Sequence, residues 1–378
     1  MMKVTTGGND NASIVGKFAS QTLRSGKEKY MPKYYDVRYD LERFPDAWLI
    51  MVLSKRGPGK TYSTLRYMIE EHVQFVFLKR TIDDVKNLCA SDGGDLDLSP
   101  FKPLNRDFGW DIHPKLIQKG VAGFYDCSGE TQELVGYCLA ANMAQKFKGF
   151  DLSDVDYMIF DEFIPRPWEK IHKKEGDMIL DLYETIARDR VKRGRKELIF
   201  ICLANAVEVN NPLCKTMDLV DILADMDVTE TEITYMKEKG IFIRILNSNF
   251  DVDEDTKLTG IQRAMAGTQW AASAYGAHFS YNDFTAIGKQ KLKGFKCLYR
   301  IIYNLTEYYV YRKGTQYFVA KVKGSTDKTY DLTRENQQKL FWDEEGFYLR
   351  EAAIEDKVIF GDYTSYNLIT NYRKEFTL

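Results

Sequence analysis

The chain has 378 residues, of which 44% are hydrophobic and 13% are aromatic, and its formal net charge at pH 7 is −2. This hydrophobic content can bury the core of one large or two medium-sized domains, so a chain that is disordered throughout is excluded. Because the net charge is close to zero, any surface that binds nucleic acid must be local rather than a property of the whole chain.

The sequence also argues against membrane insertion and secretion. No window approaches eighteen apolar residues, and the N-terminal sequence lacks the apolar core of a signal peptide, so we expect neither a transmembrane helix nor export. The six cysteines are widely spaced and form no C-x-x-C pair. That pattern predicts free thiols in a reducing cytoplasm rather than a zinc site or a disulfide framework.

The N-terminal two thirds of the chain predict a flexible arm followed by an α/β domain. Residues 1–35 are polar and without clear periodicity, which is typical of an arm. From residue 36 to 246, short apolar runs alternate with helix-compatible segments. The runs are Ala47–Leu53, Phe75–Lys79, Asp156–Phe160 and Leu198–Ala204. Continuous apolar runs of this length predict the buried strands of a mainly parallel sheet.

Three further segments complete the predicted organisation. Ser128–Gly129–Glu130 lies between two apolar runs and predicts the turn of a β-hairpin at the sheet edge. Residues 247–290 are rich in Gly, Ala and Ser and predict a linker or small lid. In residues 291–378 aromatic, alternating strands return, which predicts a small α+β domain with an antiparallel sheet.

The clearest motif follows the first predicted strand, where Ser54–Thr61 reads SKRGPGKT and leads into a helix-compatible segment. This is the context of a Walker A phosphate loop, in which Gly57 and Gly59 let backbone N–H groups converge on a phosphate. Lys60 is predicted to reach the β- and γ-phosphates of ATP, and the Thr61 hydroxyl to bind Mg²⁺. Ser54 stands where the usual motif has its first glycine.

A matching acidic motif follows the third predicted strand, where four apolar residues lead into Asp161 and Glu162. Such a Walker B pattern, about a hundred residues after a phosphate loop, predicts that Asp161 serves Mg²⁺ and that Glu162 orients or deprotonates the attacking water. A carboxylate beside the metal-binding aspartate favours water as the nucleophile, and so an ATPase rather than a small-molecule kinase.

Two other polar features each allow two interpretations. Six basic residues occupy the nine positions from Arg188 to Lys196. They are either a solvated helix end or the source of an arginine finger that acts across a subunit boundary. Asn205 ends the fourth predicted strand, where it is either a sensor of the γ-phosphate or a cap of the following turn. Lys79 and Arg80, just past the second strand, are candidates for contacts with DNA phosphates.

Together these residues resemble the genome-packaging ATPases of phi-29-like tailed phages. The resemblance rests on KRGPGKT in the phosphate loop, IFDEFI at Ile159–Ile164, ARDR at Ala187–Arg190 and CLANAVEVNNP at Cys202–Pro212. A looser similarity runs from Gln262–Trp270 to Leu298–Asn304. The similarity therefore covers most of the chain from about Ala47 onward, but not the predicted arm.

The resemblance implies a homomeric ring, a pentamer in the family, that hydrolyses Mg-ATP at subunit interfaces. Its partners would be double-stranded DNA, the portal of a procapsid and, in some members, a packaging RNA. The protein would occupy the host cytoplasm and, transiently, the portal vertex. The family's trans-acting arginine falls on Arg188 and its trans-acting lysine on Lys148, or on Lys146 if the alignment slips. Arg56 matches an arginine that touches phosphate or couples loop motion.

The resemblance also implies that residues 291–378 form a vestigial RNase H-like domain. Its first predicted strand, Leu298–Asn304, carries no Asp or Glu, which argues against a two-metal nuclease. Between Lys291 and Lys328 there are nine Lys or Arg against two acids, with six tyrosines interleaved. This segment is either a phosphate-backbone surface or a solubilising strand face with tyrosines packed beneath it.

The same residues leave two other functions open. A helicase or replication ATPase of the ASCE class would share every feature of the phosphate site, and unwinding of a forked duplex would distinguish it. A nucleic-acid-binding scaffold that binds ATP without turnover is the other alternative, and the intact Glu162 argues against it.

Overall fold

The computed structural model describes residues 34–55, 57–89, 98–147, 149–166, 168–169, 171–188, 190–246, 260–268, 271, 279 and 282–376. Residues 1–33 of the predicted arm and most of the predicted linker therefore lie outside the described residues. Within the described part of the chain, no helix is both long enough and apolar enough to span a membrane.

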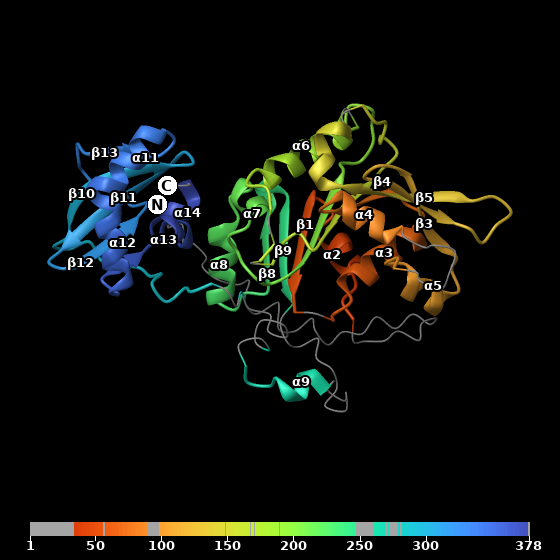
Figure 1. Ribbon diagram of the computed structural model, residues 1–378, viewed down its shortest axis with the longest axis horizontal. Coiled ribbons are helices and arrows are strands. Elements are labelled where there is room, and N and C mark those ends of the chain that lie inside the picture. The colour runs from red at the N-terminus through yellow and green to blue at the C-terminus, as the bar shows by residue number, and fades with distance from the viewer. Residues whose placement is uncertain are drawn as a thin grey trace, which may run out of the picture. The chain divides into compact units, whose positions relative to one another are not determined.

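The N-terminal part is built around a nine-stranded mixed sheet with the order β3-β4-β5-β2-β6-β7-β1-β9-β8 (Figure 1). Its strands are β1 (Leu49–Ser54), β2 (Phe75–Lys79), β3 (Ile112–Gln118), β4 (Val121–Asp126), β5 (Glu133–Ala140), β6 (Tyr157–Asp161), β7 (Ile199–Asn205), β8 (Ile233–Met236) and β9 (Ile241–Leu246). The pairs from β5 through β2, β6, β7 and β1 to β9 are all parallel. The predicted α/β class, the mainly parallel sheet and the four apolar strands are confirmed.

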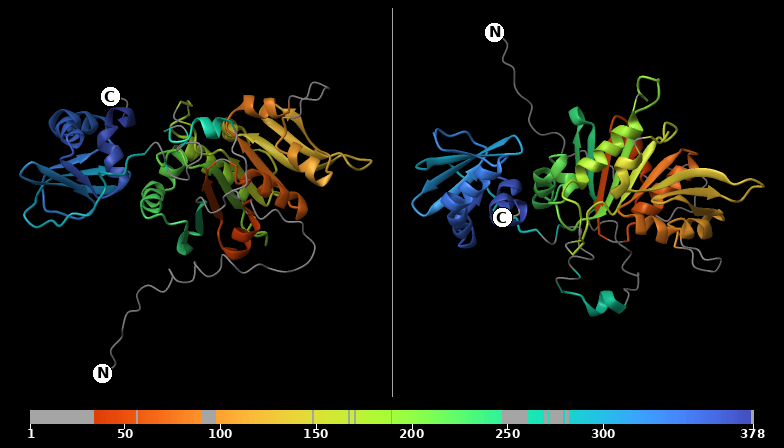
Figure 2. Two further views of the ribbon diagram at one scale, coloured as in Figure 1. Left: turned by 90° about the horizontal axis from the view of Figure 1, so that it is seen from below. Right: turned by 45° about the horizontal axis from the view of Figure 1, so that its top comes forward.

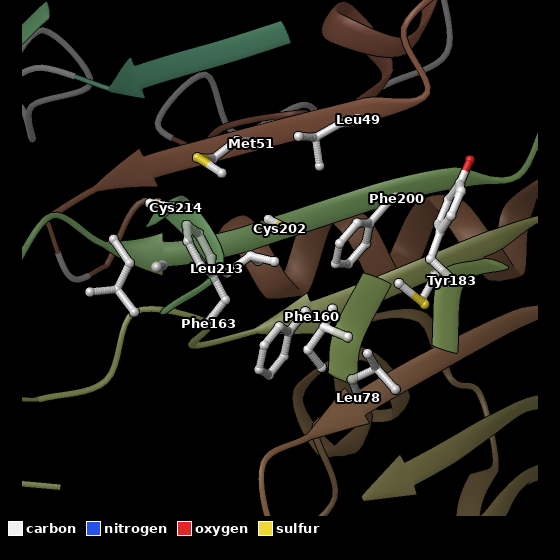
Figure 3. Packing of buried hydrophobic residues seen from close by; sticks show 14 of the residues in the cluster. Leu49, Met51, Leu78, Phe160, Phe163, Tyr183, Phe200, Cys202, Leu213 and Cys214 are labelled. Atoms are coloured by element: carbon white, nitrogen blue, oxygen red, sulfur yellow. The ribbon is translucent and has the colours of Figure 1, made fainter. Parts of the chain in front are cut away.

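Helices cover both faces of this sheet. They are α2 (Arg38–Arg43), α3 (Lys60–Glu70), α4 (Ile82–Leu88), α5 (Lys102–Phe108), α6 (Glu175–Ala187), α7 (Pro212–Thr216) and α8 (Val220–Val228), with short 3₁₀ segments at Ala141–Phe147 and Lys237–Lys239. Alternate residues of a strand point to opposite faces, so a fully buried strand needs apolar residues at every position. In β1, Leu49 and Met51 pack on the α6 face, shown in Figure 3, while Ile50 and Val52 pack on the α3 face.

The predicted hairpin is confirmed, because β4 and β5 pair antiparallel on either side of Ser128–Glu130. The sequence did not indicate β3, which pairs antiparallel with β4 and is the edge strand, or β8 and β9 at the opposite edge. β3 is solvent-exposed along most of its length, so it lacks the continuous apolar run that marks a buried strand.

The C-terminal part is a separate five-stranded sheet with the order β13-β10-β11-β12-β14. Its strands are β10 (Lys296–Tyr303), β11 (Thr306–Lys313), β12 (Gln316–Ala320), β13 (Thr329–Asp331) and β14 (Val358–Phe360). The first three pair antiparallel, whereas β13 and β14 join the edges in parallel. The predicted α+β character of this segment is confirmed.

One face of the smaller sheet is covered by helices (Figure 2). The elements are α11 (Glu335–Phe341), a π-helical turn (Trp342–Gly346), α12 (Phe347–Ile354), α13 (Tyr363–Thr370) and α14 (Tyr372–Phe376). The opposite face carries a smaller apolar cluster that includes Tyr309, Tyr311 and Phe318. In the sequence, the short helix α9 (Gly260–Ala264) comes after the last strand of the first sheet and within the predicted linker.

Candidate nucleotide-binding site

The predicted phosphate loop joins a strand to a helix, as its motif requires. β1 ends at Ser54 and α3 begins at Lys60, with Gly59 as its N-cap residue. Gly57 and Gly59 have φ angles of 100° and 81°, a left-handed region that side chains with a Cβ rarely adopt. A Cβ on Gly59 would also lie 3.0 Å from Cδ1 of Tyr34. Both glycines are therefore required by the shape of the loop.

Lys60 is buried at the centre of the loop, with 9% of its surface exposed. Its Nζ donates to the Ser54 hydroxyl, to the Lys55 carbonyl at 3.3 Å and to Asn205 Oδ1 at 3.4 Å. Burial lowers the pKa of Lys60 to about 8, although the charges of Asp161 and Glu162 oppose that shift. The ammonium donates only to neutral oxygens in the described part of the chain, so an anion such as a phosphate fits beside it.

Thr61 and Asp161 meet although a hundred residues separate them in sequence. The Thr61 hydroxyl donates to Asp161 Oδ1 at 2.9 Å, and Lys79 Nζ lies 3.6 Å from Asp161 Oδ2. A hydroxyl beside a carboxylate is the oxygen donor set that Mg²⁺ prefers with phosphates. Among the described residues, no group of three or more His, Cys, Asp or Glu could hold a metal. The pair therefore fits Mg²⁺ only when phosphate oxygens and water complete the shell.

Glu162 follows directly after β6 and is exposed. Its φ angle of 55° is in the left-handed region, which is uncommon for a residue other than glycine. The charge of Glu162 acts to raise the pKa of Lys60, so the two side chains are close enough to interact electrostatically. The role of Glu162 as the group that activates water stays a prediction.

Asn205 also reaches the site. It ends β7 in register with Ser54 of β1, and its side-chain oxygen accepts from Lys60. The cap of the next helix, α7, is Asn211 instead. The geometry favours the site interpretation of Asn205 over a cap, and its role as a phosphate sensor stays a prediction.

The basic run after α6 separates into structural and exposed arginines. α6 ends at Ala187 and Arg188 is its C-cap residue, so the run begins at the helix end and continues into the loop that follows. Arg190 is 2% exposed and holds backbone carbonyls together with Asp156, to which Arg195 also donates. Arg188 is exposed and has no ion-pair partner in the described part of the chain. Of these three arginines only Arg188 is exposed, and its action on a neighbouring subunit stays a prediction.

Two predicted site residues, Arg56 and Lys148, lie outside the described residues. Lys146, the alternative to Lys148, is exposed in the 3₁₀ segment after β5. The two candidates for contacts with DNA, Lys79 and Arg80, both form ion pairs within the chain. Lys79 pairs with Asp161, because these two residues end the neighbouring strands β2 and β6. Arg80, directly after β2, pairs with the buried Glu175 of α6.

A cluster of three side chains that supports the phosphate loop was not predicted from the sequence. Tyr35 donates its backbone N–H to the Pro58 carbonyl at 2.9 Å and its hydroxyl to Asp40 at 2.8 Å. Asp40 is fully buried and accepts two hydrogen bonds from Arg244 Nε, at 2.9 and 3.1 Å. The cluster ties the phosphate loop to β9. The sequence did not indicate this cluster because Tyr35, Asp40 and Arg244 do not form a recognisable motif along the chain.

In the C-terminal sheet, tyrosines of the basic segment pack inward. Four of them are at most 4% exposed: Tyr299, Tyr308, Tyr309 and Tyr311. Several cations are paired, such as Lys328 with Glu344 and Glu345 at 3.1 and 2.8 Å. The geometry therefore favours a solubilising strand face over a surface on which bases stack on these rings.

A strand that ends in a glycine-rich loop, a helix that begins at a buried lysine and a nearby strand that ends in two acids define a P-loop nucleotide-binding domain. The chain belongs to the family of Podovirus DNA encapsidation proteins (Gp16), whose sequence model matches residues 34–341. This confirms the resemblance inferred from the sequence.

Individual relatives agree with the family assignment. The DNA packaging proteins of Bacillus phages PZA and phi29 are each 24% identical to this chain over 320 residues, which is 82% of this chain and 87% of each relative. A chain of the solved bacteriophage Phi-29 viral genome packaging motor assembly shares the fold, with a TM-score of 0.62 and 18% identity. That match covers 91% of this chain and 99% of the other.

Proposed function

We propose that the protein is the ATPase subunit of a viral genome-packaging motor that moves double-stranded DNA into a procapsid. The observation that carries the proposal is the meeting of Thr61 with Asp161 beside the buried Lys60, in a chain of the DNA encapsidation family. The similarity to DNA packaging proteins over most of the chain supports the partner, and the phosphate loop supports ATP as the energy source.

Each site residue has a defined task in this mechanism. Lys60 and the loop N–H groups bind the β- and γ-phosphates, and Thr61 and Asp161 hold Mg²⁺, which neutralises phosphate charge. Glu162 orients water and accepts its proton. The sheet order supports the ASCE class, because one additional strand, β7, separates the phosphate-loop strand from the strand that precedes Glu162.

We further propose that hydrolysis takes place between subunits of a homomeric ring, with Arg188 acting on the site of a neighbour. Its exposure at the end of α6 supports this role, whereas Arg190 is held in its own subunit. Lys148 would act with it in trans, and Arg56 would contact phosphate in cis. A pentameric ring, a portal at the procapsid vertex and a packaging RNA belong to the same proposal. The same proposal places the protein in the host cytoplasm.

The proposed organisation is an arm at 1–35, an ATPase domain at 36–246, a linker at 247–290 and a C-terminal domain at 291–378. The last would be a vestigial RNase H-like domain for docking or nucleic-acid binding. Its three leading antiparallel strands support the comparison, and β10 supplies no carboxylate for a nuclease metal.

The first experiment is steady-state ATPase of the full chain, with and without long double-stranded DNA, beside Glu162→Gln. We expect turnover that DNA stimulates and that the substitution reduces by about 10²-fold or more. Turnover that survives loss of Glu162 would reject the proposed base. Turnover that ignores long duplexes but accompanies unwinding of a forked duplex would instead indicate a helicase.

The trans role of Arg188 is tested by mixing two inactive variants. Arg188→Ala subunits keep Glu162, and Glu162→Gln subunits keep Arg188, so a mixed ring contains complete sites only if the arginine crosses the interface. Recovery of ATPase on mixing is expected. Complete absence of recovery, in a mixture that assembles like the native ring, would contradict action in trans.

A further inference from the structure

We propose that Arg80 is the positioning residue for Glu162 and that it acts on the backbone of the turn rather than on the carboxylate. The inference rests on the proposed ATPase function, because it concerns the group that activates water. The sequence pattern gave Arg80 no part in the nucleotide site. The structure places it under the turn that carries Glu162.

The turn after β6 has a conformation that its own sequence does not favour. Glu162 has φ of 55°, where the Cβ of an L-residue is crowded, and glycine is the usual occupant. Such a conformation persists only when the surrounding structure holds it in place. The Phe163 amide is fixed by a hydrogen bond to the Leu203 carbonyl of β7 at 3.2 Å, and the carbonyls of the turn need a donor as well.

Arg80 supplies that donor. Its Nη2 donates to the carbonyl of Glu162 at 3.2 Å and to that of Phe163 at 2.9 Å. One nitrogen therefore fixes two consecutive peptide groups on the C-terminal side of the Glu162 Cα. Because the Cα–Cβ direction follows the backbone, holding these peptides fixes where the Glu162 carboxylate can reach.

The guanidinium is itself held rigidly. Nε donates to both carboxylate oxygens of Glu175 at 3.1 and 3.2 Å, and Nη1 lies 3.3 Å from a Glu169 oxygen. Glu175 is only 7% exposed in the first turn of α6, and the guanidinium carbon lies 5.6 Å from the centre of the Phe160 ring. The Arg80 side chain is 15% exposed, so solvent screens these contacts only weakly.

These contacts require the planar guanidinium of an arginine, which carries several donors in fixed directions. Three nitrogens of one planar group serve Glu175, Glu169 and the turn at once. A lysine at this position could still neutralise Glu175 as a point charge but could not also span the carbonyls. Arg80→Lys therefore keeps the buried carboxylate paired, and so keeps the fold, while it releases the turn.

The chain offers a matched control at the opposite end of β6. Arg195 donates to the backbone carbonyls of Ser153 and Asp154 and to the Asp156 carboxylate, just before the strand begins. It has the same type of contacts as Arg80, and among the described residues these contacts include none of the nucleotide site. Arg195→Lys therefore shows how much activity is lost when a guanidinium with several hydrogen bonds is replaced away from the nucleotide site.

The kinetic test compares both variants of the full chain with the native protein in DNA-stimulated ATPase. For Arg80→Lys we expect kcat to fall about 10- to 100-fold, as for a misplaced catalytic group, with KM for ATP within about twofold. Arg195→Lys should stay within about twofold in both. In a Glu162→Gln background, Arg80→Lys should cause no further loss. Equal effects of the two lysine variants, or a loss confined to KM, would overturn the inference.

Amide hydrogen exchange of the turn tests the inference without any turnover. The Phe163 amide should exchange at least about tenfold faster in Arg80→Lys than in the native protein, and at the native rate in Arg195→Lys. Unchanged exchange in Arg80→Lys would overturn the inference even if activity fell. If instead the exchange behaves as expected while no variant or native protein hydrolyses ATP, the structural role of Arg80 stands and the proposed ATPase function fails.

Discussion

Arg190 and Arg188 lie two residues apart in the same basic run, and the structure predicts opposite consequences for their replacement by alanine. Arg190 is 2% exposed. Its Nε donates to the Lys196 carbonyl at 2.7 Å, and its Nη atoms donate to the Val155 carbonyl and, at 2.5 Å, to Asp156. These contacts fasten the loop before β6 to the loop before β7.

The magnitude follows from what Arg190→Ala leaves behind. The buried Val155 carbonyl loses its donor, at about 1–3 kcal/mol, and the part-buried Lys196 carbonyl loses a hydrogen bond from a charged group, at about 1.5–3 kcal/mol. Asp156 is 37% exposed and keeps Arg195 at 3.0 Å, so its charge is not left unpaired. We therefore expect the free energy of unfolding to fall by about 3–5 kcal/mol, from the loss of the two hydrogen bonds to backbone carbonyls. Arg188→Ala should change it by less than about 0.5 kcal/mol.

Thermal unfolding followed by circular dichroism, with both variants measured in parallel, checks this prediction. At roughly 2–4 °C per kcal/mol for a domain of this size, Arg190→Ala should lower the midpoint by about 6 °C or more. Arg188→Ala should melt like the native protein while it loses ATPase in the assembled ring. Equal midpoints for the two variants, or a larger loss in Arg188→Ala, would refute the division of the run into a structural and an exposed arginine.

Two further predictions concern the phosphate loop. Because burial lowers the pKa of Lys60 to about 8 and phosphate binds its ammonium form, the affinity for a fluorescent ATP analogue should fall above pH 8, by up to about tenfold per pH unit. In Lys60→Arg, which stays charged, the affinity should be flat over the same range; a flat native profile would contradict the shifted pKa. Gly59→Ala and Gly194→Ala both place a Cβ at positive φ, so each should cost about 1–2 kcal/mol of stability. Only Gly59→Ala should also weaken binding of the analogue, by tenfold or more, and equal affinities in the two variants would argue against the loop as the phosphate site.

The sequence predicted the parts of the fold and site that depend on local pattern. β1, β2, β6 and β7 are buried on both faces and read as unbroken apolar runs. The edge strands β3 and β8 lack this signature, and Arg244 interrupts the apolar run of β9, so these three strands were not indicated. The order of the strands, including the place of β7 between β1 and β6, could not be predicted either, because it depends on pairing between segments far apart in the sequence.

The tyrosines of the C-terminal sheet show the same limit. Alternation of Tyr with Lys and Arg fits both a nucleic-acid surface and an ordinary strand face, because a period of two says only that the two kinds of residue point in opposite directions. Which of the two faces is covered depends on the helices that follow. Tyr299 and Tyr308 are buried because those helices pack on their side of the sheet.

By itself the sequence determined the chemistry of the site. Lys60 and Thr61 are fixed by the loop that contains them, and Asp161 and Glu162 by the strand that they follow, because each motif is a continuous stretch of backbone. Only the tertiary structure decided which other cations serve that site. Arg80 reaches the turn at Glu162 because β2 pairs with β6. Such contacts join residues that are about eighty positions apart, and their pairing is set by how the strands assemble rather than by any spacing along the chain.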